Sequence, residues 1–452
     1  MSYVKRMIHF FWPAISDEDI SRFGILSSIY FFLIGAYWLI RVMKDPLFAS
    51  LVGYSYQPFA KMVSLITVIL GVLFYNKLLD VLRRNTLFYS LALFFGVGFV
   101  IIGYCTLPTT QVFLENPSWL QWVPGRFLGW VAYCFIELYG SLMPALFLSI
   151  IASTISASSA KTGWGLLAFF AQLGAILGAG LVTLYTKTLG IGVLFAIGGA
   201  SVCILPFLMR WYIKTTDIEA SSTGEKPQKT SMIEGLKLIL SRPYVAGLLV
   251  VTVTYEIIST IVEFQMGLCA TQIYPTAADG GAGFAWLKGL QGVSTNTLAL
   301  VFALLGTSFF MRKFGLKFCL VSYPALIGSS IVILLGMYLC GATTYTLMWG
   351  FFASVIMYKA FSYTLNNPSK EVIYIPTSKD VKFKAKSWID AFGNRTSKGI
   401  GSTVTASLGS HFPTLFIFGS FISLGLILGW ILVALFMGTT FNKLQEEQKI
   451  IE

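Results

Sequence analysis

The feature that most constrains this chain is a series of long apolar runs, separated by short polar connectors, between residues 24 and 437. Each run is about as long as the roughly 20 residues that a helix needs to cross the hydrocarbon core of a bilayer. Only 12% of the residues are charged, whereas soluble chains usually carry about twice that share, so lipid must serve as the solvent. The runs predict an all-α membrane protein with twelve transmembrane helices, at 24–41, 61–79, 87–107, 127–153, 164–186, 190–210, 244–268, 290–311, 317–340, 344–365, 387–409 and 413–437.

A long polar segment divides the predicted helices into two groups of six. We expect an N-terminal six-helix bundle over 1–211, a cytoplasmic linker over 212–243 and a C-terminal six-helix bundle over 244–452. The linker contains the Ser, Gly, Glu and Pro residues that keep a connecting segment flexible. The chain is therefore predicted to consist of two half-bundles.

Two further observations favour a repeated architecture. Tyr139 and Tyr363 are separated by the same interval as Trp164 and Trp388. The basic connector after the second helix, at 76–84, contains an Asp and has a shorter basic counterpart after the eighth helix. These connectors are similar to the basic loop of the major facilitator superfamily, in which two six-helix halves rock around a central site. The resemblance implies a major-facilitator-like fold.

The distribution of lysine and arginine predicts the orientation in the membrane. Cations are concentrated in the even-numbered connectors, whereas the opposite connectors contain little beyond Lys61, Arg126, Lys187 and Lys288. Positive loops stay in the cytoplasm, so both termini are expected there. The net charge of +12 reflects this topology, and since the cations are dispersed, no nucleic-acid partner is expected.

Several kinds of chemistry find no support in the sequence. The six cysteines occur singly, and the two histidines, His9 and His411, are far apart, so no metal site is predicted. No Walker-type phosphate loop and no nucleophile motif is present. We expect no enzyme and no cofactor, and transport driven by a gradient or by exchange.

Charges inside the apolar runs are the candidate site residues of the first half. A charge in the middle of the bilayer costs about 2.5–3.5 kcal/mol on insertion scales, so it usually faces a cavity and has a function. Arg41 and Lys44 share a helical face near Pro46 and suit anionic groups, although cations at a helix end also snorkel to the interface. Glu137 lies deep in the fourth helix, where it would pair with a cation, bind a proton or hydrogen-bond a substrate.

The second half contains two comparable groups. Glu256 and Glu263 lie two turns apart on nearly one face of the seventh helix, and one of them would be the counterpart of Glu137. The eleventh predicted helix contains Asp390 and a same-face cation pair, Arg395 and Lys398, followed by glycines that let a helix or ligand approach. The alternating Lys-Phe-Lys-Ala-Lys at 382–386 is typical of a solvated loop.

The long motif at 367–398 includes Asn-Pro-Ser-Lys-Glu, Tyr-Ile-Pro, Lys-Ala-Lys-Ser-Trp-Ile-Asp and Gly-Asn-Arg. Together with Lys44-Asp45, Glu137-Leu138-Tyr139-Gly140-Ser141 and Val262-Glu263, it resembles the nucleotide transporter (ATP/ADP translocase) family of plastids and intracellular bacteria. That family is a distant branch of the major facilitator fold.

The resemblance implies exchange of nucleotides, or nucleotide uptake with protons, by a monomer in a bacterial inner membrane. It implies that Lys44, Glu137 and Glu263 are charged positions needed for transport. A further lysine would be Lys386 or Lys398, with Arg395 as a phosphate partner. The same matched motifs place Tyr139, Asn394 and Asp390 among the candidate substrate-binding residues, and Glu256 and Arg41 join them as intramembrane charges.

One departure from the family leaves the substrate open. Typical ATP/ADP exchangers carry a Trp-Lys pair and a further lysine where this chain has Met266, Gly267 and Thr271. A nucleotide with fewer phosphates, a dinucleotide or another nucleotide-like anion therefore fits as well as ATP. The alternative is a facilitator-fold, proton-coupled symporter for an unrelated small polar metabolite, with Glu137 or Glu263 as its proton site. A membrane-embedded enzyme or structural protein is the third reading.

Overall fold

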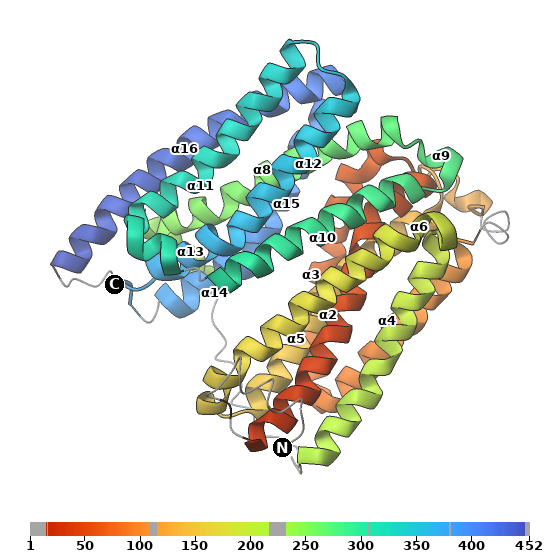
Figure 1. Ribbon diagram of the computed structural model, residues 1–452, viewed down its shortest axis with the longest axis horizontal. Coiled ribbons are helices and arrows are strands. Elements are labelled where there is room, and N and C mark those ends of the chain that lie inside the picture. The colour runs from red at the N-terminus through yellow and green to blue at the C-terminus, as the bar shows by residue number, and fades with distance from the viewer. Residues whose placement is uncertain are drawn as a thin grey trace. The chain divides into compact units, whose positions relative to one another are not determined.

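The computed structural model describes Ile15 and residues 17–107, 115–216, 232–305, 308–378 and 381–447. His9 and the middle of the predicted linker, 217–231, lie outside this described part. Within it the chain is helical and contains no β-strand, which confirms the all-α prediction (Figure 1). The long helices are α2 (Asp17–Leu51), α3 (Gln57–Val81), α4 (Arg84–Cys105), α5 (Phe127–Thr154), α6 (Ala157–Thr216), α8 (Pro243–Ile273), α10 (Ala282–Leu305), α11 (Ser308–Leu339), α12 (Thr344–Phe361), α15 (Asn394–Leu408) and α16 (Phe412–Glu446).

Shorter elements connect these helices. They are the 3₁₀ turns η1 (Tyr54–Tyr56) and η3 (Ser118–Leu120), the helices α7 (Met232–Ser241), α9 (Thr276–Asp279), α13 (Asn367–Ile373) and α14 (Lys386–Trp388), and the π-helical turns η4 (Ser362–Asn366), η5 (Val381–Ala385) and η6 (Ile389–Gly393). The elements η5, α14, η6 and α15 follow one another without a break. The segment 382–386, expected as a solvated loop, is therefore helical, and π turns of this kind are frequent at functional sites.

The predicted membrane spans correspond to these helices. Eight helical segments of the described chain are long and apolar enough to cross a membrane. One of them, α6, contains two predicted spans, because the helix turns sharply at Gly190, whose φ of 77° favours glycine. The remaining three predicted spans are α10, α12 and α15, which are shorter or more polar. The turn at Gly190 therefore divides α6 into two segments, which correspond to the predicted spans 164–186 and 190–210.

The first compact unit comprises Met1–Tyr54, Ile66–Lys226 and Tyr274–Asn296. Its central contact joins α2 and α6. Gly174 and Gly178 of α6 lie against the backbone carbonyls of Phe31 and Gly35 of α2, so closely that a Cβ atom at either position would collide with them. Small residues spaced four apart are how membrane helices approach closely without a hydrophobic driving force. This packing fixes α2, which carries Lys44.

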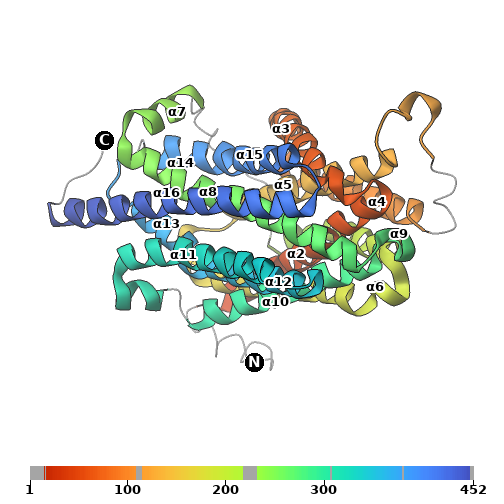
Figure 2. The same cartoon turned by 90° about the horizontal axis from the view of Figure 1, so that it is seen from above.

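The second compact unit comprises Ser55–Leu65, Pro227–Ile273 and Thr297–Glu452. Here α8 packs against α12, α15 and α16 (Figure 2). A Cβ atom at Gly401 of α15 would lie 2.9 Å from Cβ of Thr260 and 3.0 Å from the backbone oxygen of Ile257. The glycine thus lets α15 lie directly on α8, beside its two glutamates. The division into bundles at 1–211 and 244–452 remains a prediction.

Candidate functional site

In the first unit, Lys44 of α2 forms an ion pair with Glu137 of α5. The Lys44 side chain is 10% exposed, and its ammonium lies 4.3 Å from the ring centroid of Tyr133, a cation–π contact. The Glu137 side chain is 37% exposed, so the pair is only partly buried. The structure therefore brings together the two charges that the sequence singled out in the first half.

Arg41 makes different contacts from Lys44 although both lie on α2. Its guanidinium carbon is 5.4 Å from the ring centroid of Tyr37 and 5.1 Å from that of Trp38, and the group donates a 3.0 Å hydrogen bond to the Tyr37 hydroxyl. Tyr139 is fully buried and donates a 3.1 Å hydrogen bond to the backbone oxygen of Leu33, which ties α5 to α2. Substrate contacts of Arg41 and Tyr139 stay predictions.

A second ion pair of the first unit was not predicted. Lys288 of α10 lies 3.6 Å from Asp45 of α2, and both side chains are largely buried. The expected span began at residue 290, whereas the helix begins at Ala282, so that Lys288 was assigned to a connector. The apolar residues before it, including Phe284, whose ring centroid is 5.8 Å from the Lys288 ammonium, were the signal that this residue lies in a helix.

In the second unit, each glutamate of α8 has its own lysine. Glu263 lies 2.6 Å from the ammonium of Lys359 on α12, and the Ser259 hydroxyl donates a 3.2 Å hydrogen bond to it. Glu256 lies 3.7 Å from Lys398 on α15, whose side chain is 54% exposed. Both glutamates of α8 thus lie beside a lysine of another helix, as Glu137 does in the first unit. Lys359 was overlooked, although a single lysine within the apolar run 344–365 is the same signal that identified Glu137.

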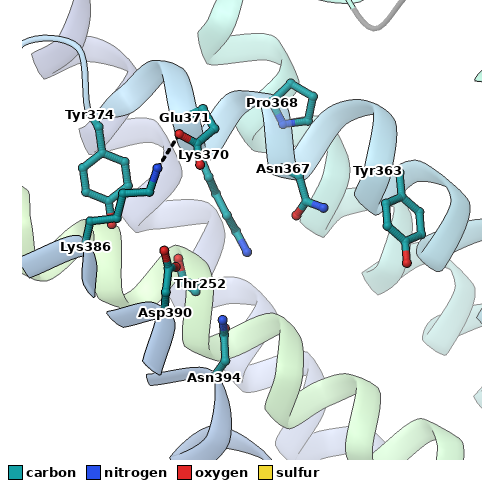
Figure 3. Close-up of a pocket in the computed structure, with 10 residues that line it drawn as sticks. All are labelled: Thr252, Tyr363, Asn367, Pro368, Lys370, Glu371, Tyr374, Lys386, Asp390 and Asn394. Carbon is teal, nitrogen blue, oxygen red and sulfur yellow. Dashed lines mark hydrogen bonds and ion pairs between the residues drawn. The ribbon is translucent and has the colours of Figure 1, made fainter. Parts of the chain in front are cut away.

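A pocket of about 470 Å³ opens in the second unit where the π-helical turns follow one another (Figure 3). The charged and amide side chains on its walls are Asn367, Lys370 and Glu371 of α13, Lys386 of α14, Asp390 of η6 and Asn394 of α15. Three of the predicted site residues, Lys386, Asp390 and Asn394, thus share this pocket. Arg395 and Lys398, predicted with them, are not among its lining residues.

Two cations of this pocket differ in their contacts. Lys386 forms a 2.5 Å ion pair with Glu371, and its ammonium lies 5.3 Å from the ring centroid of Tyr374. Lys370 forms no ion pair with any side chain in the described part of the chain. Burial lowers the pKa of Lys370 from its ordinary value to about 8, and the nearby carboxylates of Glu256 and Asp390 oppose this shift.

The charged pairs lie within a chain whose sequence matches one family throughout. The sequence profile described as "TLC ATP/ADP transporter" matches residues 2–443. This chain belongs to the TLC ATP/ADP transporter family. Curated relatives of this TLC chain include "ADP,ATP carrier protein 2, chloroplastic" of Arabidopsis thaliana, 25% identical over 94% of this chain and 75% of the relative. Another is "ADP,ATP carrier protein 1" of Rickettsia bellii, 24% identical over 92% of this chain and 91% of the relative.

Solved structures establish the fold of this TLC protein. A bacterial homologue of the iron transporter ferroportin in an inward-facing state superposes with a TM-score of 0.65 at 12% identity, covering 93% of this chain and 99% of that one. The nucleoside transporter NupG has a TM-score of 0.58 at 13% identity, covering 92% and 99%. A D-xylose–proton symporter has a TM-score of 0.61 at 16% identity, covering 92% and 97%. These similarities confirm the major-facilitator-like fold.

Met266, Gly267 and Thr271, where the sequence departs from typical exchangers, all belong to α8. Met266 and Gly267 are buried, and Gln265 beside them donates a 3.1 Å hydrogen bond to the backbone oxygen of Leu415 on α16. The Thr271 hydroxyl bonds to the backbone oxygen of Leu268 at 3.1 Å. The TLC chain therefore fills these positions with uncharged residues and carries its charges one turn or more earlier, at Glu256 and Glu263.

Proposed function

We propose that this protein is a secondary transporter that exchanges nucleotides, or closely related phosphorylated anions, across a bacterial inner membrane by alternating access. The observation that carries the proposal is the match to the TLC ATP/ADP transporter family over residues 2–443. The relatives named as ADP,ATP carriers, from a plastid-bearing plant and from Rickettsia, extend over nearly the whole chain. Membership of a transporter family also favours transport over catalysis.

The ion pairs suggest how the substrate is held. Lys44, Lys359 and Lys398 are each neutralised by a glutamate on another helix. A phosphate group binds lysine through the same charge-assisted hydrogen bonds as a carboxylate does. We infer that the substrate phosphates compete with Glu137, Glu263 and Glu256 for these ammonium groups. Binding would then loosen contacts between helices, and that is the event that alternating access requires.

The same pairing favours exchange over proton symport. A substrate anion can replace a carboxylate at its lysine, because both form charge-assisted hydrogen bonds with the ammonium. Glu137 and Glu263, the candidate proton sites, both have such partners. The proton-coupled symporter for an unrelated metabolite is thereby the weaker candidate, although the D-xylose–proton symporter shares the fold.

The proposal also covers the two halves of the chain, their orientation in the membrane and the oligomeric state. We infer that the two halves, 1–211 and 244–452, move relative to each other on the linker 212–243, with both termini in the cytoplasm. The excess of lysine and arginine in the even-numbered connectors supports this orientation. A monomer that needs no cofactor suffices for this mechanism, since substrate coordination is assigned to side chains of a single chain.

Uptake into proteoliposomes tests the proposal. Labelled ATP, ADP, AMP, GTP, UTP and NAD would be supplied outside, with and without unlabelled counter-substrate inside and with and without a proton gradient. We expect uptake of at least one nucleotide that depends on internal nucleotide and not on the gradient. Absence of uptake for every nucleotide by correctly folded protein would refute nucleotide transport. Uptake that follows the gradient alone would support the symporter.

A further inference from the structure

The pocket between α8, α13, α14, η6 and α15 contains Lys370, whose ammonium lies 5.9 Å from the ring centroid of Tyr255 and forms no ion pair within the described part of the chain. Lys370 extends from α13 across the pocket toward Asp390 and Asn394 on the opposite wall (Figure 3). Within the described part of the chain, the amides of Asn367 and Asn394 form no hydrogen bond with another side chain or the backbone. Asn367 is exposed and Asn394 is half-buried, so a molecule that enters the pocket can reach both amides and form hydrogen bonds with them.

Thr252 of α8 is a second, independent sign. The residue is 6% exposed and lines the pocket, yet its hydroxyl forms no hydrogen bond in the described structure. A Ser or Thr hydroxyl in a membrane helix usually donates a hydrogen bond to the backbone carbonyl one turn before it. Thr260 does so, at 2.8 Å from the backbone oxygen of Glu256. The free hydroxyl of Thr252 is thus available to a bound molecule. The volume of about 470 Å³ falls within the range of roughly 300–1,000 Å³ typical of small-molecule sites.

The charges of the pocket indicate what kind of molecule fits. Lys386 and Glu371 neutralise each other through their 2.5 Å ion pair. That leaves one cation, Lys370, and one carboxylate, Asp390, as the groups that face the space. Glu256, from α8, acts on Lys370 electrostatically but is itself paired with Lys398. The ligand should therefore bring one anionic group and, beside it, hydroxyl or amine donors.

We propose that this pocket is a subsite for one phosphate and the adjoining ribose of a nucleotide, with Lys370 binding the phosphate and Asp390 accepting hydrogen bonds from the ribose hydroxyls. The proposal rests on the proposed function and deepens it. A carboxylate that accepts ribose hydroxyls is a common arrangement in nucleotide sites. The amides of Asn367 and Asn394 and the Thr252 hydroxyl supply the remaining hydrogen bonds. Since Lys370 is the single lysine of the lining that forms no ion pair within the described part of the chain, the pocket matches one phosphate rather than a triphosphate.

Equilibrium binding to the full chain in lipid nanodiscs tests the phosphate contact. AMP and adenosine would be compared on the wild type, Lys370→Gln, Lys370→Arg and the control Lys443→Gln, whose side chain is 75% exposed at the end of α16. We expect the wild type and the control to prefer AMP by about tenfold, Lys370→Gln to lose that preference with adenosine binding unchanged, and Lys370→Arg to keep most of it. The Lys370→Arg variant keeps the positive charge, so it shows whether an effect of Lys370→Gln comes from the lost charge or from impaired folding.

The ribose contact has its own measurement. We expect the wild type to bind AMP more tightly than 2′,3′-dideoxy-AMP, and Asp390→Asn to reduce that difference. An unchanged AMP preference in Lys370→Gln, while nucleotide exchange continues in proteoliposomes, would overturn the subsite and leave the proposed function intact. If AMP, ADP and ATP neither bind nor exchange in the wild type, the proposed function and this inference both fail. An unchanged ribose preference in Asp390→Asn would remove the assignment of Asp390.

Discussion

Breaking the Glu263–Lys359 pair should expose how much this intramembrane contact contributes. Two unit charges 2.6 Å apart attract each other by about 6 kcal/mol at an effective dielectric constant of about 20. Desolvation of both ions cancels most of that gain. Each side chain is 22% exposed, so the pair lies between surface pairs, worth about 0.2–1 kcal/mol, and buried pairs, whose disruption costs about 3–5 kcal/mol. We expect a coupling energy of about 2 kcal/mol.

A double-mutant cycle measures this coupling. Glu263→Gln, Lys359→Gln and the double variant would be unfolded reversibly by SDS in mixed micelles, with tryptophan fluorescence as the signal. The losses of unfolding free energy in the two single variants should together exceed the loss in the double variant, because each single variant leaves one charge without its partner. The control cycle uses Lys443 and Glu447, 3.9 Å apart at the exposed end of α16, for which we expect about 0.3–0.5 kcal/mol. A Glu263–Lys359 coupling no larger than that of the control would refute the reasoning.

Three further predictions concern transport and packing. Lys44→Ala and Glu137→Ala should each abolish nucleotide exchange while the protein still inserts, and normal uptake by either would remove that residue from the site. Gly401→Val should force α15 away from α8 and cost about 1–3 kcal/mol of stability along with transport, whereas Gly425→Ala on α16, with open space around it, should be neutral in the same unfolding assay. Because the pKa of Lys370 is about 8, Lys370 is charged below that pH and neutral above it. AMP binding should therefore weaken as the pH rises through 8 in the wild type but not in Lys370→Arg, and identical profiles would contradict the phosphate contact.

The sequence predicted the parts of the site that depend on local rules. Glu137 and Glu263 were identified because an isolated charge in an apolar run is costly, and this rule needs no knowledge of the fold. The ion pair with Lys44 could only be stated as one of several alternatives for Glu137. Its formation depends on the packing of α2 with α5, and no spacing along the chain determines that contact.

The residues that were missed depend on tertiary structure or on helix boundaries. Lys288 was assigned to a connector because the predicted span began at residue 290, eight residues after the helix begins at Ala282, which is more than the one or two residues by which helix ends usually differ. Lys370 was not singled out, because it falls in the connector between the predicted spans 344–365 and 387–409. The segment instead folds into α13 and π-helical turns against α8, so that Lys370 becomes buried. Local composition cannot indicate burial of that kind.

The ion pair between α2 and α5 also has a consequence for biosynthesis. Lys44 and Glu137 are separated by 93 residues, so the ribosome needs about 5–20 seconds to produce the second residue after the first. Until then the lysine lies in its helix without the carboxylate, and an unpaired charge in a membrane helix costs free energy. We expect α2 to remain at the insertion machinery until α5 emerges. The time at which Glu137 is synthesised would therefore determine when α2 is released into the bilayer.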